Sequence, residues 1–108
     1  MLEIHSDDDW HMLMEFSDKL PVIIDWYASW CSPCSKIAPL YVECAEKFAN
    51  QAIFYKADVD DVPDLAVEND VSALPTLMIL LGKRVVWMGQ LNEGVLEKLG
   101  EKLEALKK

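Results

Sequence analysis

The sequence of 108 residues contains no long uninterrupted apolar segment and little positive charge. No run approaches the roughly 20 apolar residues needed to cross a bilayer, so a membrane-spanning protein is not expected. Ten basic and nineteen acidic residues give a net charge of −9, which disfavours binding to nucleic acid or anionic membranes through a basic patch. We interpret this acidity as a solubility feature, with selection of partners by charge as the alternative.

The sequence also has few cysteines and no recognisable targeting segment. Its three cysteines do not resemble the disulfide framework of a small secreted domain. The first nine residues are rich in aspartate and lack the basic and apolar regions of a secretory signal, so we expect a cytosolic protein. Repeats, low-complexity stretches and linker-like runs are absent from the sequence, and residues 1–108 are therefore predicted to form one domain.

Apolar periodicity and turn residues predict a chain of alternating strands and helices. The run 22–27 is β-branched and aromatic, which is typical of a central strand buried on both faces. Gly82-Lys83 predicts a two-residue hairpin, and Pro39 predicts a kink within its helix. The expected strands are 2–5, 22–27, 52–58, 76–81 and 84–88, and the expected helices are one after the N-cap Ser6, then 33–49 and 63–68, and one after the N-cap Asn92. This order predicts an α/β fold in which a mixed five-stranded sheet is flanked by four helices.

Cys31 and Cys34 follow the predicted central strand and lie at the start of the next helix. A helix N-terminus favours the reactive thiolate form of cysteine, and two thiols at this spacing can form a disulfide. The second thiol can also attack a mixed disulfide that the first has formed. The alternative is half of a zinc site, although the sequence has no second Cys-x-x-Cys and no His-x-x-x-His to complete four ligands. The spacing alone leaves both interpretations open.

Several other residues have both a structural and a functional interpretation. Asp25 is either a costly buried carboxylate or a strand-edge residue that faces water. Pro75 is first interpreted as an ordinary proline at the start of a strand. Cys44 falls on the apolar stripe of its helix, which indicates a core residue, with a regulatory thiol as the alternative. The acidic segment 58–64 and the two histidines, His5 and His11, are predicted to be solvated.

Four segments of the sequence resemble thioredoxins, and together they cover essentially the whole chain. Residues 25–34, Asp-Trp-Tyr-Ala-Ser-Trp-Cys-Ser-Pro-Cys, resemble the family's active-site segment, and residues 37–39 continue the match. Residues 56–61 are similar to the family's third strand and its acidic exit. Leu74-Pro75-Thr76 matches the loop with the family's cis-proline, and Gly89 matches the glycine that follows its last strand. The resemblance is stronger to eukaryotic cytosolic members than to bacterial ones.

This resemblance implies the thioredoxin fold and a general protein-disulfide reductase that thioredoxin reductase regenerates. Cys31 is expected to be the attacking thiolate and Cys34 the resolving thiol, with no metal and no further cofactor. Asp25 is expected beneath Cys34 as its proton acceptor, with Lys56 as the charge partner of that carboxylate. A cis Leu74–Pro75 bond is expected to face Cys31 and to leave the backbone free to pair with an extended substrate. The expected docking surface comprises Trp30, Ser32, Pro33, Ala73, Leu74, Pro75, Gly89 and Gln90.

The sequence departs from the family pattern at two positions near the cysteines. Ser32 stands where glycine is usual, and Lys36 lies one residue later than the lysine of many members. Both changes are expected to alter the redox potential, whereas the absence of histidine between the cysteines favours a reductase. The alternatives are a dedicated electron donor to a narrow client such as peroxiredoxin, or a binding module whose cysteines are incidental. We expect a monomer that binds neither nucleic acid nor membranes.

Overall fold

A computed structural model describes residues 1–107, in which five strands form one mixed sheet in the order β1-β3-β2-β4-β5. Strands β1, β3 and β2 run parallel, and β4 and β5 pair antiparallel. The strands are β1 (Leu2–Glu3), β2 (Val22–Tyr27), β3 (Ile53–Asp58), β4 (Thr76–Leu81) and β5 (Arg84–Gln90). The helices are α1 (Asp7–Phe16), α2 (Ser32–Lys47), α3 (Pro63–Glu68), α4 (Glu93–Glu97) and α5 (Leu99–Leu106).

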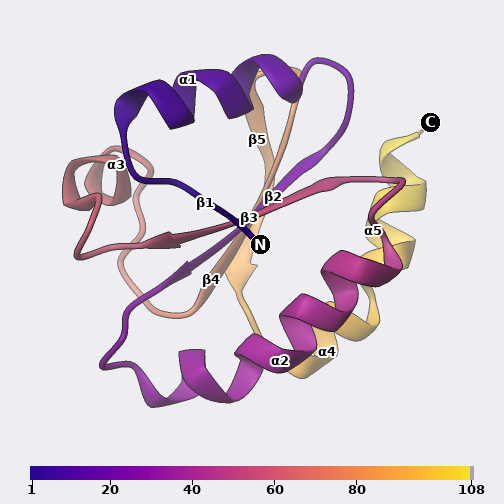
Figure 1. The fold of residues 1–108 in the computed structure, drawn as a ribbon. Coiled ribbons are helices and arrows are strands. Elements are labelled where there is room, and N and C mark those ends of the chain that lie inside the picture. Colours follow the sequence, from indigo (N-terminus) through magenta and orange to yellow (C-terminus); the bar gives the residue numbers. More distant parts are fainter. Residues whose placement is uncertain (108) are drawn as a thin grey trace.

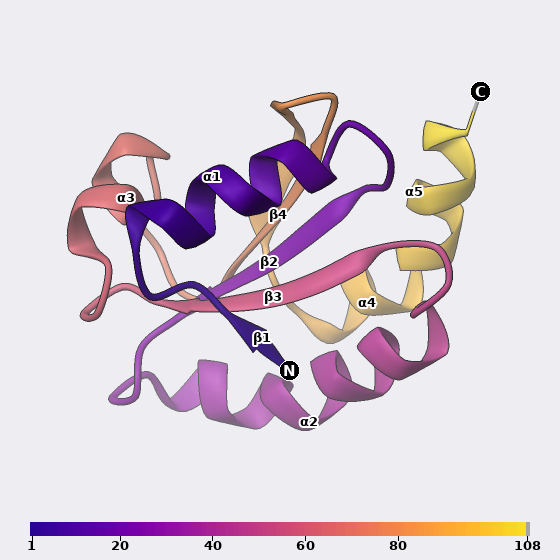
Figure 2. The same cartoon turned by 45° about the horizontal axis from the view of Figure 1, so that its top comes forward.

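Helices cover both faces of the sheet and create two apolar cores (Figures 1 and 2). On one face α1 and α3 pack over a core that includes Leu13 and Trp26. On the other face α2, α4 and α5 pack over a core that includes Ile23, Tyr41 and Leu77. Residues 22–26 of β2 are buried because alternate side chains point into these two cores, which confirms the predicted central strand.

Local capping and turn chemistry also follow the prediction. The Ser6 hydroxyl accepts a hydrogen bond from the Asp9 N–H at the start of α1. The Asn92 side chain accepts one from the Val95 N–H at the start of α4. Gly82 and Lys83 both have positive φ, 63° and 64°, as a two-residue hairpin between antiparallel strands requires.

The end of the chain corrects the expected number of helices from four to five. The single predicted closing helix is divided at Lys98 into α4 and α5. The Lys98 N–H donates to the carbonyls of both Gly94 and Val95, which indicates a tightened last turn of α4. Leu99 and Leu103 of α5 nevertheless remain buried, so the apolar stripe that suggested one helix continues across the break.

Three strand boundaries also differ from the prediction, and the smallest difference is at β3, which begins at Ile53 and not at residue 52. The first strand ends at Glu3 because the His5 N–H donates to the Asp9 carboxylate instead of to a neighbouring strand. The last strand extends to Gln90, so Gly89 lies inside β5 and not after it. No helix among residues 1–107 has the length and apolar character needed to span a membrane.

Candidate redox site

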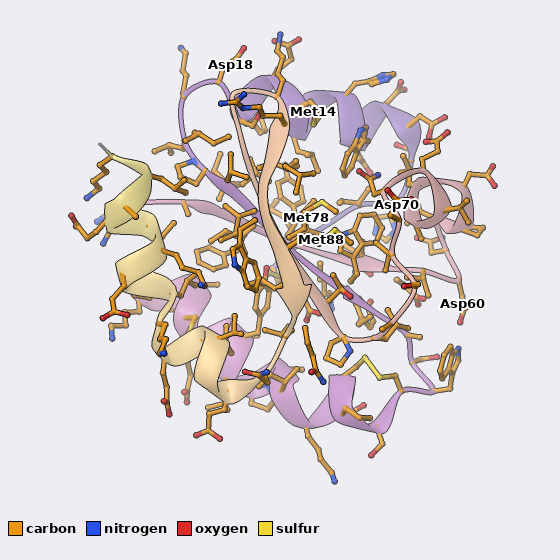
Figure 3. All side chains as sticks on the ribbon, turned by 180° about the vertical axis from the view of Figure 1, so that it is seen from behind. Met14, Asp18, Asp60, Asp70, Met78 and Met88 are labelled. Atoms are coloured by element: carbon orange, nitrogen blue, oxygen red, sulfur yellow. A yellow bond between two sulfur atoms is a disulfide. The ribbon has the colours of Figure 1, made fainter. Side chains whose placement is uncertain are left out.

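Cys31 and Cys34 form a disulfide at the start of α2, immediately beyond the carboxyl end of β2 (Figure 3). Their Cα atoms are 5.3 Å apart. Cys31 is the N-cap of the helix, and its sulfur accepts a hydrogen bond of 3.2 Å from the Cys34 N–H. Pro33 occupies the first helical turn, where no N–H is needed for the helix. The helix terminus therefore directs its positive end and a backbone donor at the Cys31 sulfur.

The disulfide lies in a small apolar cluster at the surface of the molecule. Cys31 and Cys34 are 6% and 3% exposed and pack with Ala28, while Leu74 and Val59 pack against this cluster. Ser32 and Pro33, which separate the cysteines, are both exposed. The cysteine side chains are thus almost fully shielded from water, whereas Ser32 and Pro33 between them are accessible.

Trp30 precedes the cysteine pair and is 71% exposed, as expected for a docking residue beside a reactive thiol. Its indole N–H donates a hydrogen bond of 2.8 Å to the Asp60 carboxylate. Asp60 is exposed, as the predicted solvated segment 58–64 requires, and it also accepts this hydrogen bond, which was not predicted. Figure 3 shows Asp60 in the loop between β3 and α3. Sequence alone gave no signal for this contact because it joins residues 30 positions apart.

Asp25 lies within β2 on the same sheet face as Ile23, which packs beneath α2. It is 4% exposed, and its Oδ1 has no hydrogen-bond partner among the described residues. Burial raises the pKa of the Asp25 carboxyl to about 7, while the positive charge of Lys56 opposes that shift. Asp25, Cys34 and Lys56 line one cleft of about 160 Å³. The structure thus brings together the three groups that the resemblance assigned to proton transfer.

Lys56 is the β3 residue opposite Asp25 in the sheet register. Its ammonium nitrogen is 3.9 Å from Oε1 of Glu3, the residue opposite Lys56 on the other neighbouring strand. No ion pair within 4.0 Å joins Lys56 to Asp25 in residues 1–107. The charge of Lys56 therefore acts on Asp25 at a distance, while its contact ion pair is with Glu3, which the sequence reading did not identify.

A second groove, of about 410 Å³, lies between β5 and the loop before β4. The peptide bond between Leu74 and Pro75 is cis, as the resemblance implied. Leu74 borders both the groove and the disulfide cluster, while Pro75 is buried next to it. The residues that line the groove are Asp70, Ser72, Ala73, Leu74, Thr76, Met88, Gly89 and Gln90. Four of the expected docking residues, Ala73, Leu74, Gly89 and Gln90, therefore line one groove, together with Asp70 and Met88, which Figure 3 labels.

Gly89 also has a packing role that its match to the family did not predict. A Cβ built at this position would come within 2.9 Å of the Trp87 ring. Lys102 of α5 also contacts this ring, and its ammonium lies 4.6 Å from the ring centroid. Glycine at position 89 therefore lets the Trp87 ring lie against β5.

Cys44 is partly buried in the core beneath α2, as its place on the apolar stripe predicts. Burial raises the pKa of its thiol, which lowers the fraction of reactive thiolate at neutral pH.

No cluster of three or more potential metal-ligating side chains occurs within residues 1–107. The Cys31–Cys34 pair accordingly stands beside a carboxyl, an ammonium and a surface groove, which are the parts needed for thiol–disulfide exchange.

The fold and this site define a thiol-disulfide oxidoreductase. The family model described as Thioredoxin matches residues 2–104. The chain belongs to the thioredoxin family, and its activity is that of a protein-disulfide reductase.

Individual relatives and solved structures agree with this membership. Thioredoxin H4 of Arabidopsis thaliana is 41% identical over 85 residues, which cover 76% of this chain and 71% of the relative. Thioredoxin-1 of Saccharomyces cerevisiae is 51% identical over 69 residues, which cover 63% of this chain and 65% of the relative. A structure of Plasmodium falciparum thioredoxin superimposes with a TM-score of 0.85 at 29% identity and covers 94% of this chain and 98% of that one.

Proposed function

We propose that Cys31 is the attacking nucleophile of this reductase and that Cys34 resolves the resulting mixed disulfide. The observation that carries this assignment is the position of the pair at the start of α2, with Cys31 as the N-cap and Cys34 one turn later. A thiolate at the N-cap is stabilised by the helix terminus. Cys34 is the member of the pair that lines the cleft shared with Asp25.

The reaction then proceeds in two exchanges. The Cys31 thiolate attacks one sulfur of the substrate disulfide, which releases the other substrate sulfur as a thiolate and leaves a mixed disulfide. The Cys34 thiol loses its proton and attacks the Cys31 sulfur, which releases the second substrate sulfur. The substrate gains two electrons and, after protonation, two thiols, while Cys31 and Cys34 become the disulfide. We assign Asp25 as the group that accepts the Cys34 proton, with Lys56 as its charge partner.

The docking surface is proposed to be the groove beside Leu74 together with Trp30, Ser32, Pro33, Pro75 and Gly89. An extended substrate segment can pair with the backbone beside the cis Leu74–Pro75 bond, and this mode of binding recognises backbone shape more than side-chain sequence. This supports a general reductase over a dedicated donor to one client such as peroxiredoxin. The redox-active pair beside Asp25 likewise does not favour a binding module with incidental cysteines.

Members of the thioredoxin family work with thioredoxin reductase and with disulfide-containing proteins, and we propose the same electron source here. We further propose a monomeric cytosolic protein whose residues 1–108 form one thioredoxin domain, without a bound cofactor, nucleic acid or membrane. The family match over residues 2–104 supports the single domain. Cys44 is a free thiol, and the one disulfide among residues 1–107 is the redox pair itself, so no structural disulfide points to an oxidising compartment.

Insulin reduction tests this function with two electron sources. With NADPH and thioredoxin reductase, the protein should accelerate precipitation of the insulin B chain, and Cys31→Ser should remove the acceleration. Cys44→Ser is the matched control and should retain it, because that thiol lies outside the site. Activity with dithiothreitol but not with the reductase would refute the proposed electron source. Inactivity with both would refute the reductase function itself.

A further inference from the structure

Glu3, Lys56 and Asp25 form a row across three neighbouring strands. Glu3 is opposite Lys56 in the pairing of β1 with β3, and Asp25 is opposite Lys56 in the pairing of β2 with β3. Side chains at paired positions point to the same face of a sheet, with adjacent strands about 4.8 Å apart. The Lys56 side chain therefore rises between two carboxyl groups, a buried one toward the sheet centre and a half-buried one at its edge.

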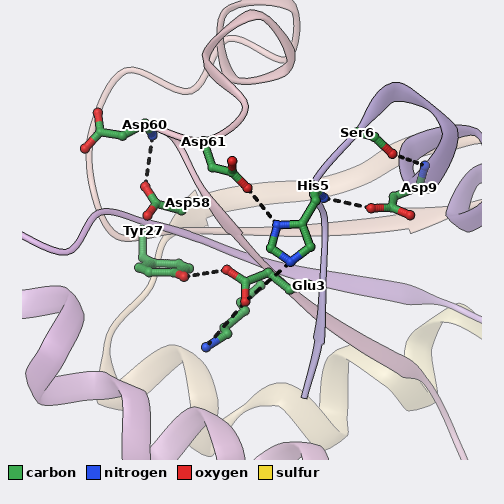
Figure 4. A network of polar contacts seen from close by, with 9 residues as sticks. Glu3, His5, Ser6, Asp9, Tyr27, Asp58, Asp60 and Asp61 are labelled. Carbon is green, nitrogen blue, oxygen red and sulfur yellow. Dashed lines mark hydrogen bonds and ion pairs between the residues drawn. The ribbon is translucent and has the colours of Figure 1, made fainter.

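The contacts in this row favour the carboxylate at the edge. The Lys56 ammonium is 3.9 Å from Oε1 of Glu3 and 5.6 Å from the centroid of the Tyr27 ring. The Tyr27 hydroxyl donates a hydrogen bond of 2.7 Å to Oε2 of the same glutamate (Figure 4). Glu3 is thereby fixed from two sides, while Oδ1 of Asp25 has no hydrogen-bond partner in residues 1–107.

We propose that Glu3 is a positioning residue of the redox site, which holds the Lys56 ammonium toward the sheet edge and leaves the Asp25 carboxyl only partly compensated. Tyr27 keeps the Glu3 carboxylate in place for this purpose. An ammonium that is free to approach Asp25 would stabilise its ionised form more strongly. Glu3 therefore sets how readily this buried carboxyl exchanges a proton near neutral pH.

This inference deepens the proposed function and rests on Asp25 as the proton acceptor of Cys34. A proton acceptor is most effective when it titrates near the working pH, because it must both take up and return the proton. Burial places the Asp25 carboxyl in that range, and direct pairing with Lys56 would move it out. By holding the Lys56 ammonium at the sheet edge, Glu3 thus keeps the Asp25 carboxyl titrating near neutral pH.

Other titratable groups face the same row and must be accounted for in any pH measurement. His5, just beyond β1, has its Nε2 4.0 Å from Oε1 of Glu3, and its Nδ1 is 2.7 Å from the Asp61 carboxylate. His5 is exposed, and when it is protonated its charge also acts on Glu3. The remaining titratable groups that face the row or its cleft are Tyr27 from β2, Asp58 from β3 and Tyr41 from α2, whereas Cys34 is held in the disulfide and does not titrate in the oxidised protein.

The test follows the Asp25 side-chain carboxyl by ¹³C NMR during a pH titration of the oxidised protein. Asp25→Asn identifies the signal by removing it. Glu3→Gln keeps the shape and an acceptor for the Tyr27 hydroxyl but removes the charge that holds Lys56. We expect it to lower the titration midpoint of Asp25 by about half a pH unit or more. Glu46→Gln removes an exposed carboxylate on α2 that has no ion pair in residues 1–107, and it should leave the midpoint unchanged.

A second background separates positioning from simple charge removal. In Lys56→Gln, Glu3→Gln should shift the Asp25 midpoint by less than half as much as in the wild type, because no ammonium is left to move. An equal shift in both backgrounds, or no shift in the wild type, would overturn the positioning role. These titrations use no substrate, so their outcome does not depend on whether insulin reduction supports the proposed function.

Discussion

At the scale of single residues, Asp25 is a carboxyl group whose ionised form is disfavoured by burial. It is buried in the central strand, and one of its oxygens lacks a hydrogen-bond partner among the described residues. Its pKa of about 7 means that folding favours the protonated carboxyl, whereas an unfolded chain releases the proton near pH 3.8. The stability contributed by this difference is present below pH 3.8 and is lost as the pH rises to about 7.

Asp25→Asn should therefore stabilise the oxidised protein increasingly as the pH rises. Relative to the wild type, its free energy of unfolding should gain on the order of 2–4 kcal/mol between pH 4 and pH 8. Urea unfolding at several pH values measures this gain. The exposed Asp64→Asn is the control and should show no comparable increase with pH. A constant difference for Asp25→Asn across the range would mean that the carboxyl is not penalised by burial.

The short Cys-x-x-Cys motif was sufficient to predict a cysteine pair at a helix start, whereas Asp25, Lys56 and Pro75 were assigned to the site only through the resemblance to thioredoxins. The structure places Asp25 and Lys56 in one cleft with Cys34 and makes the Leu74–Pro75 bond cis, and the roles of these residues stay predictions. The sequence was not sufficient to predict the bond between Glu3 and Tyr27. That contact requires the register of β1 against β3, and a strand of two residues carries almost no periodic signal. The hydrogen bond from Trp30 to Asp60 was not predicted either, because it depends on how two loops distant in the sequence meet in the fold.

At the scale of elements, strand β1 is short and is fixed in place partly by side chains. The His5 ring, just after β1, is 2.7 Å from the carboxylate of Asp61 in the loop before α3. This hydrogen bond is the main cause that raises the pKa of His5 above its ordinary value, with the nearby carboxylates adding to it. The stabilisation is therefore full below pH 6.5 and is lost as the pH rises through the higher pKa of the folded state.

His5→Gln should remove this pH-dependent part of the stability. The loss of stability relative to the wild type should be larger at pH 5.5 than at pH 8.5, as measured by urea unfolding midpoints. Comparison with the wild type at each pH also cancels the effect of Asp25, which is present in both proteins. His11→Gln, at an exposed position on α1, should show no such difference between the two pH values. An equal loss for His5→Gln at both would refute the ion-pair contribution.

Most elements could be predicted because each carries its own local signal. The buried run of β2, the cap at Ser6 and the turn at Gly82-Lys83 are all readable from neighbouring residues. The division between α4 and α5 was not predicted, because the leucine stripe continues through it and Lys98 is no helix breaker. The break is a tightened turn in which the Lys98 N–H bonds to the Gly94 and Val95 carbonyls, and the spacing of apolar residues does not reveal such a turn.

At the scale of the whole molecule, the redox site forms where three separate segments meet beyond one end of the central strands. The start of α2 supplies the cysteines, the loop after β3 supplies Val59 and Asp60, and the loop before β4 supplies Leu74. The apolar cores on the two faces of the sheet hold these strand ends in place. Ser32 and Lys36 are both exposed beside the cysteines, and their effect on the redox potential stays a prediction.

The central claim is the division of labour between Cys31 and Cys34, and trapping of the mixed disulfide tests it most directly. Cys34→Ser, combined with Cys44→Ser to leave one thiol, should form a covalent adduct with a disulfide-containing protein such as insulin. The adduct should appear on a non-reducing gel and vanish with dithiothreitol, because no second thiol resolves it. Cys31→Ser with the same Cys44→Ser change should form none or far less. Equal or greater trapping through Cys34 would contradict the account.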